Sequence, residues 1–115
     1  MTSTMTVGEL VVAALGRLGV DHAFGVVSVH KMPMLDALAS GNAIRFIMAR
    51  GEAGAANMAD GYARGANRLG VVFTSTGPGA ANAAGGLVEA LVEVDMHALG
   101  PYPTAALPPH LRPKE

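Results

Sequence analysis

One carboxylate in this sequence stands where proton-transfer chemistry could occur. Glu52 follows the short apolar segment 44–48 after three residues and opens an alanine-rich stretch. A carboxylate in the first turn of a helix interacts favourably with the helix dipole, by about 0.3–1 kcal/mol. Alternatively, it transfers protons at the mouth of a sheet. Spacing alone favours the dipole interpretation.

A glycine loop follows the next apolar segment, 71–74. Gly77 and Gly79 permit positive φ and close backbone approach to a ligand, and Pro78 suits the first position of a helix. The free N–H groups of such a helix start can bind an anion. A tight turn between strand and helix explains the same residues equally well. The loop matches neither a Walker P-loop nor a dinucleotide-binding G-x-G-x-x-G motif.

Metal and thiolate chemistry have little support in the sequence. There is no cysteine, which excludes thiolate nucleophiles and cysteine-ligated metals. His22 lies near the start of the first predicted strand and His30 follows that strand, and neither has a second histidine at helical spacing. Packing or surface roles therefore suit these histidines better than metal ligation, and we predict no metal site.

Hydrophobic periodicity predicts the elements that position these residues. Thr6 and Glu9 have capping-box spacing at the start of a helix over 7–18. A second helix includes 35–38 and ends near Gly41. The other predicted elements are strands over 20–27, 44–48 and 71–74 and helices over 52–66 and 78–91. Strands that alternate with helices indicate an α/β fold, a partial parallel sheet in a three-layer sandwich.

Composition sets further limits on function. The 115 residues suffice for one small domain, and a formal net charge of −1 with scattered charges gives no footprint for nucleic acid. The N-terminus lacks the features of a signal peptide, and no apolar run approaches the ~20 residues of a membrane helix. We therefore expect a cytoplasmic protein that binds neither nucleic acid nor membrane.

The character of the sequence changes near Val92. Five of the seven prolines lie between residues 101 and 113, and no apolar periodicity is visible there. The predicted organisation is a domain over 1–92, followed by a proline-rich, irregular tail over 93–115.

Taken together, these segments resemble the N-terminal, pyrimidine-binding domain of thiamine-diphosphate-dependent enzymes, of the acetolactate synthase and benzoylformate decarboxylase kind. The resemblance covers roughly residues 7–91. Its motifs are a glutamate, then A-x-x-x-A-x-G-Y-A-R, a strand, and T-x-G-P-G-x-x-N; here they read RGEAGAANMADGYAR and TSTGPGAAN. They occur in the family's order and at its separations.

The resemblance implies specific roles. Glu52 would hydrogen-bond the aminopyrimidine ring nitrogen of thiamine diphosphate, so that the cofactor loses its C2 proton and attacks a 2-keto acid. The other implied cofactor-binding residues come from two loops: Gly77, Pro78, Gly79 and Asn82, and Val26, Val27 and Ser28. Val27 and Ser28 replace the Pro-Gly that the family usually carries after the first strand.

The resemblance ends after Leu91. The family continues with further strands and with a Gly-Asp-Gly…Asn motif that binds Mg²⁺ and the diphosphate; neither is found in this sequence. We interpret the chain as a truncated or frameshifted front portion, incomplete for catalysis by itself. It would need a homo-oligomer or a partner chain that carries the diphosphate-binding domain, and Mg²⁺ would enter only through that domain or partner.

Two other functions remain open. The first is a non-catalytic interaction module, or a remnant that pairs with a full-length relative. The second is an unrelated small nucleotide-binding domain, which the order of the motifs disfavours. As an enzyme portion, the chain would contribute to a lyase or transferase that decarboxylates or condenses 2-keto acids.

Overall fold

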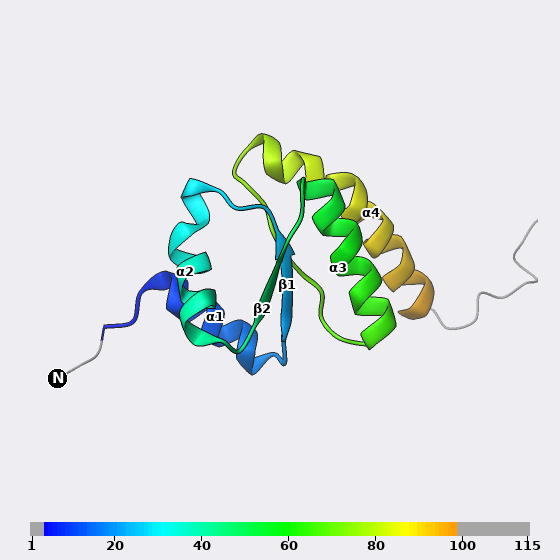
Figure 1. Cartoon of the computed structure of the whole chain (residues 1–115). Coiled ribbons are helices and arrows are strands. Elements are labelled where there is room, and N and C mark those ends of the chain that lie inside the picture. Colours follow the sequence, from blue (N-terminus) through cyan, green and yellow to red (C-terminus); the bar gives the residue numbers. More distant parts are fainter. Residues whose placement is uncertain (1–3, 99–115) are drawn as a thin grey trace, which may run out of the picture.

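The computed structural model describes residues 4–98 of the chain, and the side chains of residues 4–90. Helices and strands alternate along these residues (Figure 1). The elements in chain order are α1 (Val7–Arg17), β1 (His22–Gly25), the 3₁₀ turn η1 (Val29–Lys31), α2 (Met32–Gly41), β2 (Arg45–Met48), α3 (Glu52–Ala66), β3 (Val71–Phe73) and α4 (Pro78–Ala98).

The three strands form a parallel sheet in the order β2-β1-β3. Figure 1 shows α1 and α2 on one face of the sheet and α3 on the other, with α4 beside α3. Parallel strands need crossover connections, and helices supply them on both faces. The predicted class, an α/β partial parallel sheet in three layers, is confirmed.

The first helix begins as its sequence predicts. The Glu9 N–H donates to the Thr6 hydroxyl at 3.2 Å, and the Glu9 carboxylate accepts from the Thr6 N–H at 2.7 Å. The helix ends at Arg17, and Gly19 follows with φ of 78°. This left-handed conformation suits a glycine after a helix C-terminus.

The first strand is shorter than the predicted 20–27. Val26 still donates its N–H to the Phe73 carbonyl at 3.1 Å, but the ladder ends there and the chain turns toward η1. An apolar run cannot reveal where pairing stops, because Val27 is apolar yet 50% exposed in the loop.

The core has two parts because successive strand residues point to opposite faces of the sheet. On the face of α1 and α2, Ala23 packs in a buried cluster with Leu38 and Ile44. On the face of α3, Phe24 packs with Ala55 and Ala59. These contacts fix α3, and therefore its first residue, relative to the central strand.

The last helix extends further than predicted. It continues past Leu91 to Ala98, so residues 93–98 are helical, although the sequence placed them in an irregular tail. The rest of that predicted tail, 99–115, lies outside the described residues. None of the described helices contains a stretch both long and apolar enough to cross a membrane.

Candidate functional site

The carboxyl ends of the three strands lie side by side at one end of the sheet, because the strands are parallel; this end is called the carboxyl edge below. From β1 the chain turns toward α2, whereas from β2 and β3 it turns toward α3 and α4 on the opposite face. Neighbouring loops that leave for opposite faces mark the point where open α/β sheets bind ligands. The loop of Val26, Val27 and Ser28, the start of α3 at Glu52 and the glycine loop of Gly77 and Gly79 all lie at this edge.

Glu52 is the first residue of α3 and is half-buried. Gly51 precedes it as the N-cap, with an extended backbone and no side chain to cap the helix. Within the described part of the chain, no hydrogen bond or ion pair engages the Glu52 carboxylate. The carboxylate is therefore free to bind a ligand donor at the site edge.

The glycine loop lies directly against this carboxylate. Gly79 is buried, and a Cβ at this position would collide with Glu52 Oε1 and lie 2.7 Å from the Ser75 Cβ. Gly77 has φ of 61°, a left-handed conformation that favours glycine, and Pro78 opens α4. The absence of a side chain at Gly79 is what lets the Glu52 carboxylate reach this position.

The loop after β1 holds a second polar group without a partner. The Ser28 hydroxyl oxygen is buried, and no described residue hydrogen-bonds to it. Ser28 precedes η1 as its N-cap, yet its side chain does not cap that turn. A buried hydroxyl left unsatisfied costs about 1–3 kcal/mol, so the loop is shaped for a further polar partner.

The remaining predicted residues lie around this edge. Val26 is tied to β3 by its N–H, and Val27 is half exposed. Asn82 lies on α4 and is exposed. The structure thus brings Glu52 and Gly79 into contact, and it places the other predicted residues in the loop after β1 and at the start of α4.

A cluster of polar side chains that the sequence did not predict lies at the amino ends of the strands, opposite the candidate site. The Asp21 carboxylate accepts hydrogen bonds from the Tyr62 hydroxyl, from His22 Nδ1 at 3.0 Å and from an Arg68 guanidinium N–H at 2.6 Å. The Tyr62 hydrogen bond, followed by that of His22, lowers the pKa of Asp21 to about 2. The same bond to Asp21 raises the pKa of Tyr62.

This cluster joins α3 and the residues after it to the start of β1. The Tyr62 ring also packs against His22 and Phe24, with ring centroids 5.0 and 5.7 Å apart. Further along α3, Asp60 and Arg64, four residues apart, form an ion pair at 2.6 Å. Nothing local in the sequence indicates that Asp21 pairs with residues more than 40 positions away. Among the side chains described, those of residues 4–90, no three acidic or histidine groups lie together as a metal site.

Comparison with known proteins identifies the family. Residues 5–95 match the family model described as the N-terminal TPP-binding domain of thiamine pyrophosphate enzymes. The chain belongs to this family. Thiamine diphosphate, another name for thiamine pyrophosphate, is thus the family's cofactor, and the predicted resemblance is confirmed.

The sequence is similar to those of a 2-ketoarginine decarboxylase and of acetolactate synthases. It is 41% identical over 90 residues to a probable 2-ketoarginine decarboxylase of Pseudomonas aeruginosa, a match that covers 78% of this chain and 16% of that protein. It is 39% identical over 85 residues to the acetolactate synthase large subunit of Lactococcus lactis, covering 74% of this chain and 15% of that subunit. The chain therefore spans less than a fifth of the length of these relatives.

Proposed function

We propose that this chain binds the aminopyrimidine half of thiamine diphosphate at the carboxyl edge of its sheet. It would serve as the N-terminal portion of an acetolactate synthase-like enzyme, a lyase or transferase acting on 2-keto acids. The observation that carries the proposal is the free Glu52 carboxylate lodged against Gly79. The buried, unpartnered Ser28 hydroxyl at the same edge supports it.

The residues at this edge fit such a group. The Glu52 carboxylate is half-buried and receives no hydrogen bond from the described residues, so it is suited to accept one from a protonated ring nitrogen. Gly79 has no side chain and so leaves room for the Glu52 carboxylate, and Val27 offers apolar surface to a ring. When bound, thiamine diphosphate supplies the carbon nucleophile that attacks 2-keto acids. Glu52 holds or releases a proton at its carboxylate oxygen while α3 fixes its position.

The described residues supply only the pyrimidine side of the proposed site. We propose that a partner chain, or a second copy within a homo-oligomer, carries the diphosphate-binding domain and its Mg²⁺. This part of the proposal follows from the resemblance to the thiamine pyrophosphate enzyme family. A cytoplasmic location remains a prediction from the sequence.

Binding of the pyrimidine fragment tests the proposal without the missing domain. We expect 4-amino-2-methylpyrimidine to shift the amide resonances of Glu52 and Gly79 in ¹⁵N–¹H spectra of the full chain. Glu52→Ala should weaken this binding at least about tenfold, since a hydrogen bond to a charged group contributes about 1.5–3 kcal/mol.

Glu89→Ala is the matched control, because it removes an equal charge from an exposed position on α4. It should leave the fragment's affinity unchanged. Equal affinity in Glu52→Ala and wild type, with both chains folded, would show that the carboxylate has no part in the site. The non-catalytic interaction module would then be the better account.

A further inference from the structure

The outer edge of β2 is unpaired among the described residues. Among the described strands β2 pairs with β1 alone. The N–H groups of Arg45 and Ala49 donate to the carbonyls of Asp21, which precedes β1, and of Gly25 in β1, each at 2.8 Å. Backbone groups in a strand alternate between its two sides. The N–H and C=O groups of Phe46 and Met48 therefore point outward, where a further strand could pair with them.

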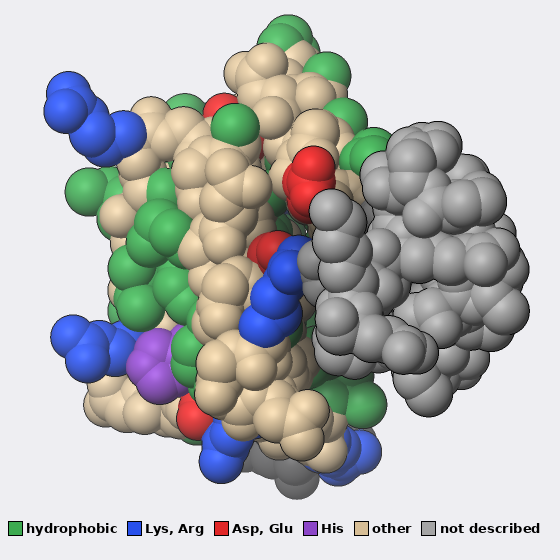
Figure 2. All heavy atoms as spheres, turned by 90° about the vertical axis from the view of Figure 1, so that its right-hand side faces the viewer, with side chains coloured by type: hydrophobic (Ala, Val, Ile, Leu, Met, Phe, Trp, Pro, Cys, Tyr) green, Lys and Arg blue, Asp and Glu red, His purple; other side chains and the backbone are tan. Residues whose placement is uncertain are grey.

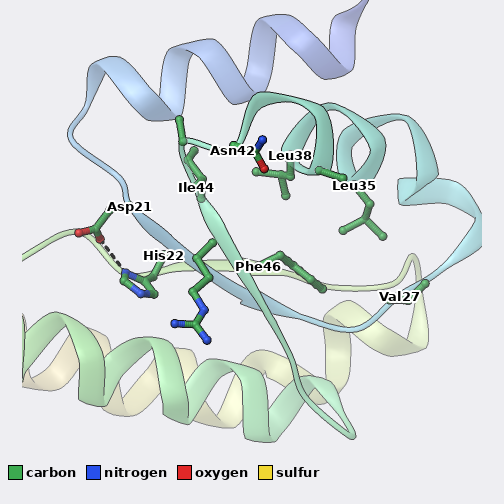
Figure 3. A pocket seen from close by; sticks show the side chains of 11 residues that line it. Asp21, His22, Val27, Leu35, Leu38, Asn42, Ile44 and Phe46 are labelled. Carbon is green, nitrogen blue, oxygen red and sulfur yellow. Dashed lines mark hydrogen bonds and ion pairs between the residues drawn. The ribbon is translucent and has the colours of Figure 1, made fainter.

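A groove runs beside this edge. Its volume is about 700 Å³, and Figure 3 shows Leu35 and Leu38 of α2 facing Ile44 and Phe46 across it. Ile44 and Phe46 lie on the α2 side of the strand, with Arg45 between them on the other side. The groove can thus receive every second side chain of a strand that pairs with β2.

The charge at this edge is unbalanced. Arg45 is exposed, and within residues 4–90 no acidic group pairs with it. In the register of β1 and β2, Arg45 lies opposite His22. The carboxylate of Asp21, the residue before His22, already accepts hydrogen bonds from three donors. Arg45 therefore offers a positive charge to whatever binds along β2.

We propose that the β2 edge binds an extended peptide segment of a partner protein by adding it as a fourth strand. The segment's alternate residues are apolar and fill the groove, and an acidic residue between them pairs with Arg45. Strand addition of this kind draws affinity from main-chain hydrogen bonds and specificity from side-chain pockets. The groove lies mainly between β2 and α2, and Val27 lines it as well. The main-chain pairing and the contact with Arg45 do not use Glu52, so the proposal stands without cofactor binding.

Charge complementarity argues against a second copy of this chain as the occupant. The segment around β2 reads AIRFIMA and has Arg45 as its one charged residue. A second β2 would bring another cation and no carboxylate to the edge. A partner segment with glutamate or aspartate is therefore the better match.

Two capped heptapeptides test this surface on the full chain. The first is Thr-Val-Glu-Val-Thr-Val-Thr, with valines on one face, and the second has lysine in place of glutamate. We expect the glutamate peptide to protect the Phe46 and Met48 amides from hydrogen exchange and to bind about 2- to 5-fold more tightly than the lysine peptide, as an exposed ion pair predicts. Arg45→Glu should reverse the preference.

Val72 provides the internal control. Phe73 accepts from β1 through its carbonyl, so the adjacent Val72 amide points to the free side of β3. Protection of Val72 instead of Phe46 would overturn the proposal, as would equal affinity for the two peptides or no binding at millimolar concentration. Protection of Phe46 that grows with protein concentration alone would assign the edge to a second copy and likewise overturn it.

Discussion

At the scale of single residues, two carboxylates have different surroundings: Asp21 at the amino ends of the strands and Glu52 at their carboxyl ends. Asp21 accepts three hydrogen bonds, from Tyr62, His22 and Arg68. Glu52 accepts none from the described residues and lies against a glycine. Asp21 thus contributes to holding α3 on the sheet, whereas Glu52 remains available to a ligand.

The hydrogen bonds of Asp21 predict an acid-sensitive contribution to stability. Its pKa falls from 3.8 in the unfolded chain to about 2 in the folded protein, so the unfolded state takes up the proton more readily. The contribution is therefore complete above about pH 4 and is lost as pH falls through about 2. We expect the difference in urea midpoint between wild type and Asp21→Asn to be constant from pH 8 to 5 and to shrink below pH 4.

Asp36→Asn serves as the control for loss of one negative charge. Asp36 is exposed on α2, and none of the described hydrogen bonds or ion pairs includes it. Its substitution should leave the urea midpoint close to that of wild type across the same range. A wild-type to Asp21→Asn difference that persists unchanged at pH 2 would refute the assigned role of the Asp21 cluster.

At the scale of elements, α4 is held against α3 by small residues. A buried stripe of Gly79, Ala83 and Gly86 runs along α4. A Cβ at Gly86 would lie 2.7 Å from the Ala56 Cβ and 3.1 Å from Asn57 Oδ1. The two helices can approach this closely at Gly86 because that residue has no side chain.

Two adjacent glycines of α4 make this contact testable. Gly86→Ala should destabilise the fold by about 1–3 kcal/mol, because it overpacks the α3–α4 contact. Gly85→Ala faces open space and should stabilise the helix by about 0.5–1 kcal/mol. Urea unfolding of both variants measures the difference, and equal stabilisation by the two would mean that the helices do not pack as described.

The elements could be predicted well where signals are local. The capping residues Thr6 and Glu9 marked the start of α1, and the alanine-rich run gave α3 its observed bounds, Glu52–Ala66. The contact of Glu52 with Gly79 could be expected only in outline, because it depends on how β2 and β3 flank β1. The end of β1 depends on tertiary pairing, which no local pattern encodes.

At the scale of the whole molecule, the sheet has two free edges within the described residues. One is β2, and the other is β3, whose segment GVVFT carries no charge to discourage pairing.

Figure 2 shows the side of the molecule that lies on the right in Figure 1, where acidic and basic side chains are scattered among apolar ones. On α4, Leu87 and Val88 are 55% and 60% exposed. A sheet of three short strands with such surfaces buries little of its apolar area.

These surfaces predict self-association when the chain is isolated. We expect sedimentation velocity to show larger species as concentration rises, and the unfolding temperature to rise with them, because association stabilises the folded state by mass action.

Leu87→Lys should shift the distribution toward monomer, since it places a charge on the exposed apolar surface of α4. Ser40→Lys, which adds the same charge to exposed α2, should not. Association that survives Leu87→Lys would place the contact away from this part of α4, at one of the two free strand edges. A monomer with a concentration-independent melt would contradict the prediction and show that three strands and their helices suffice for a stable fold.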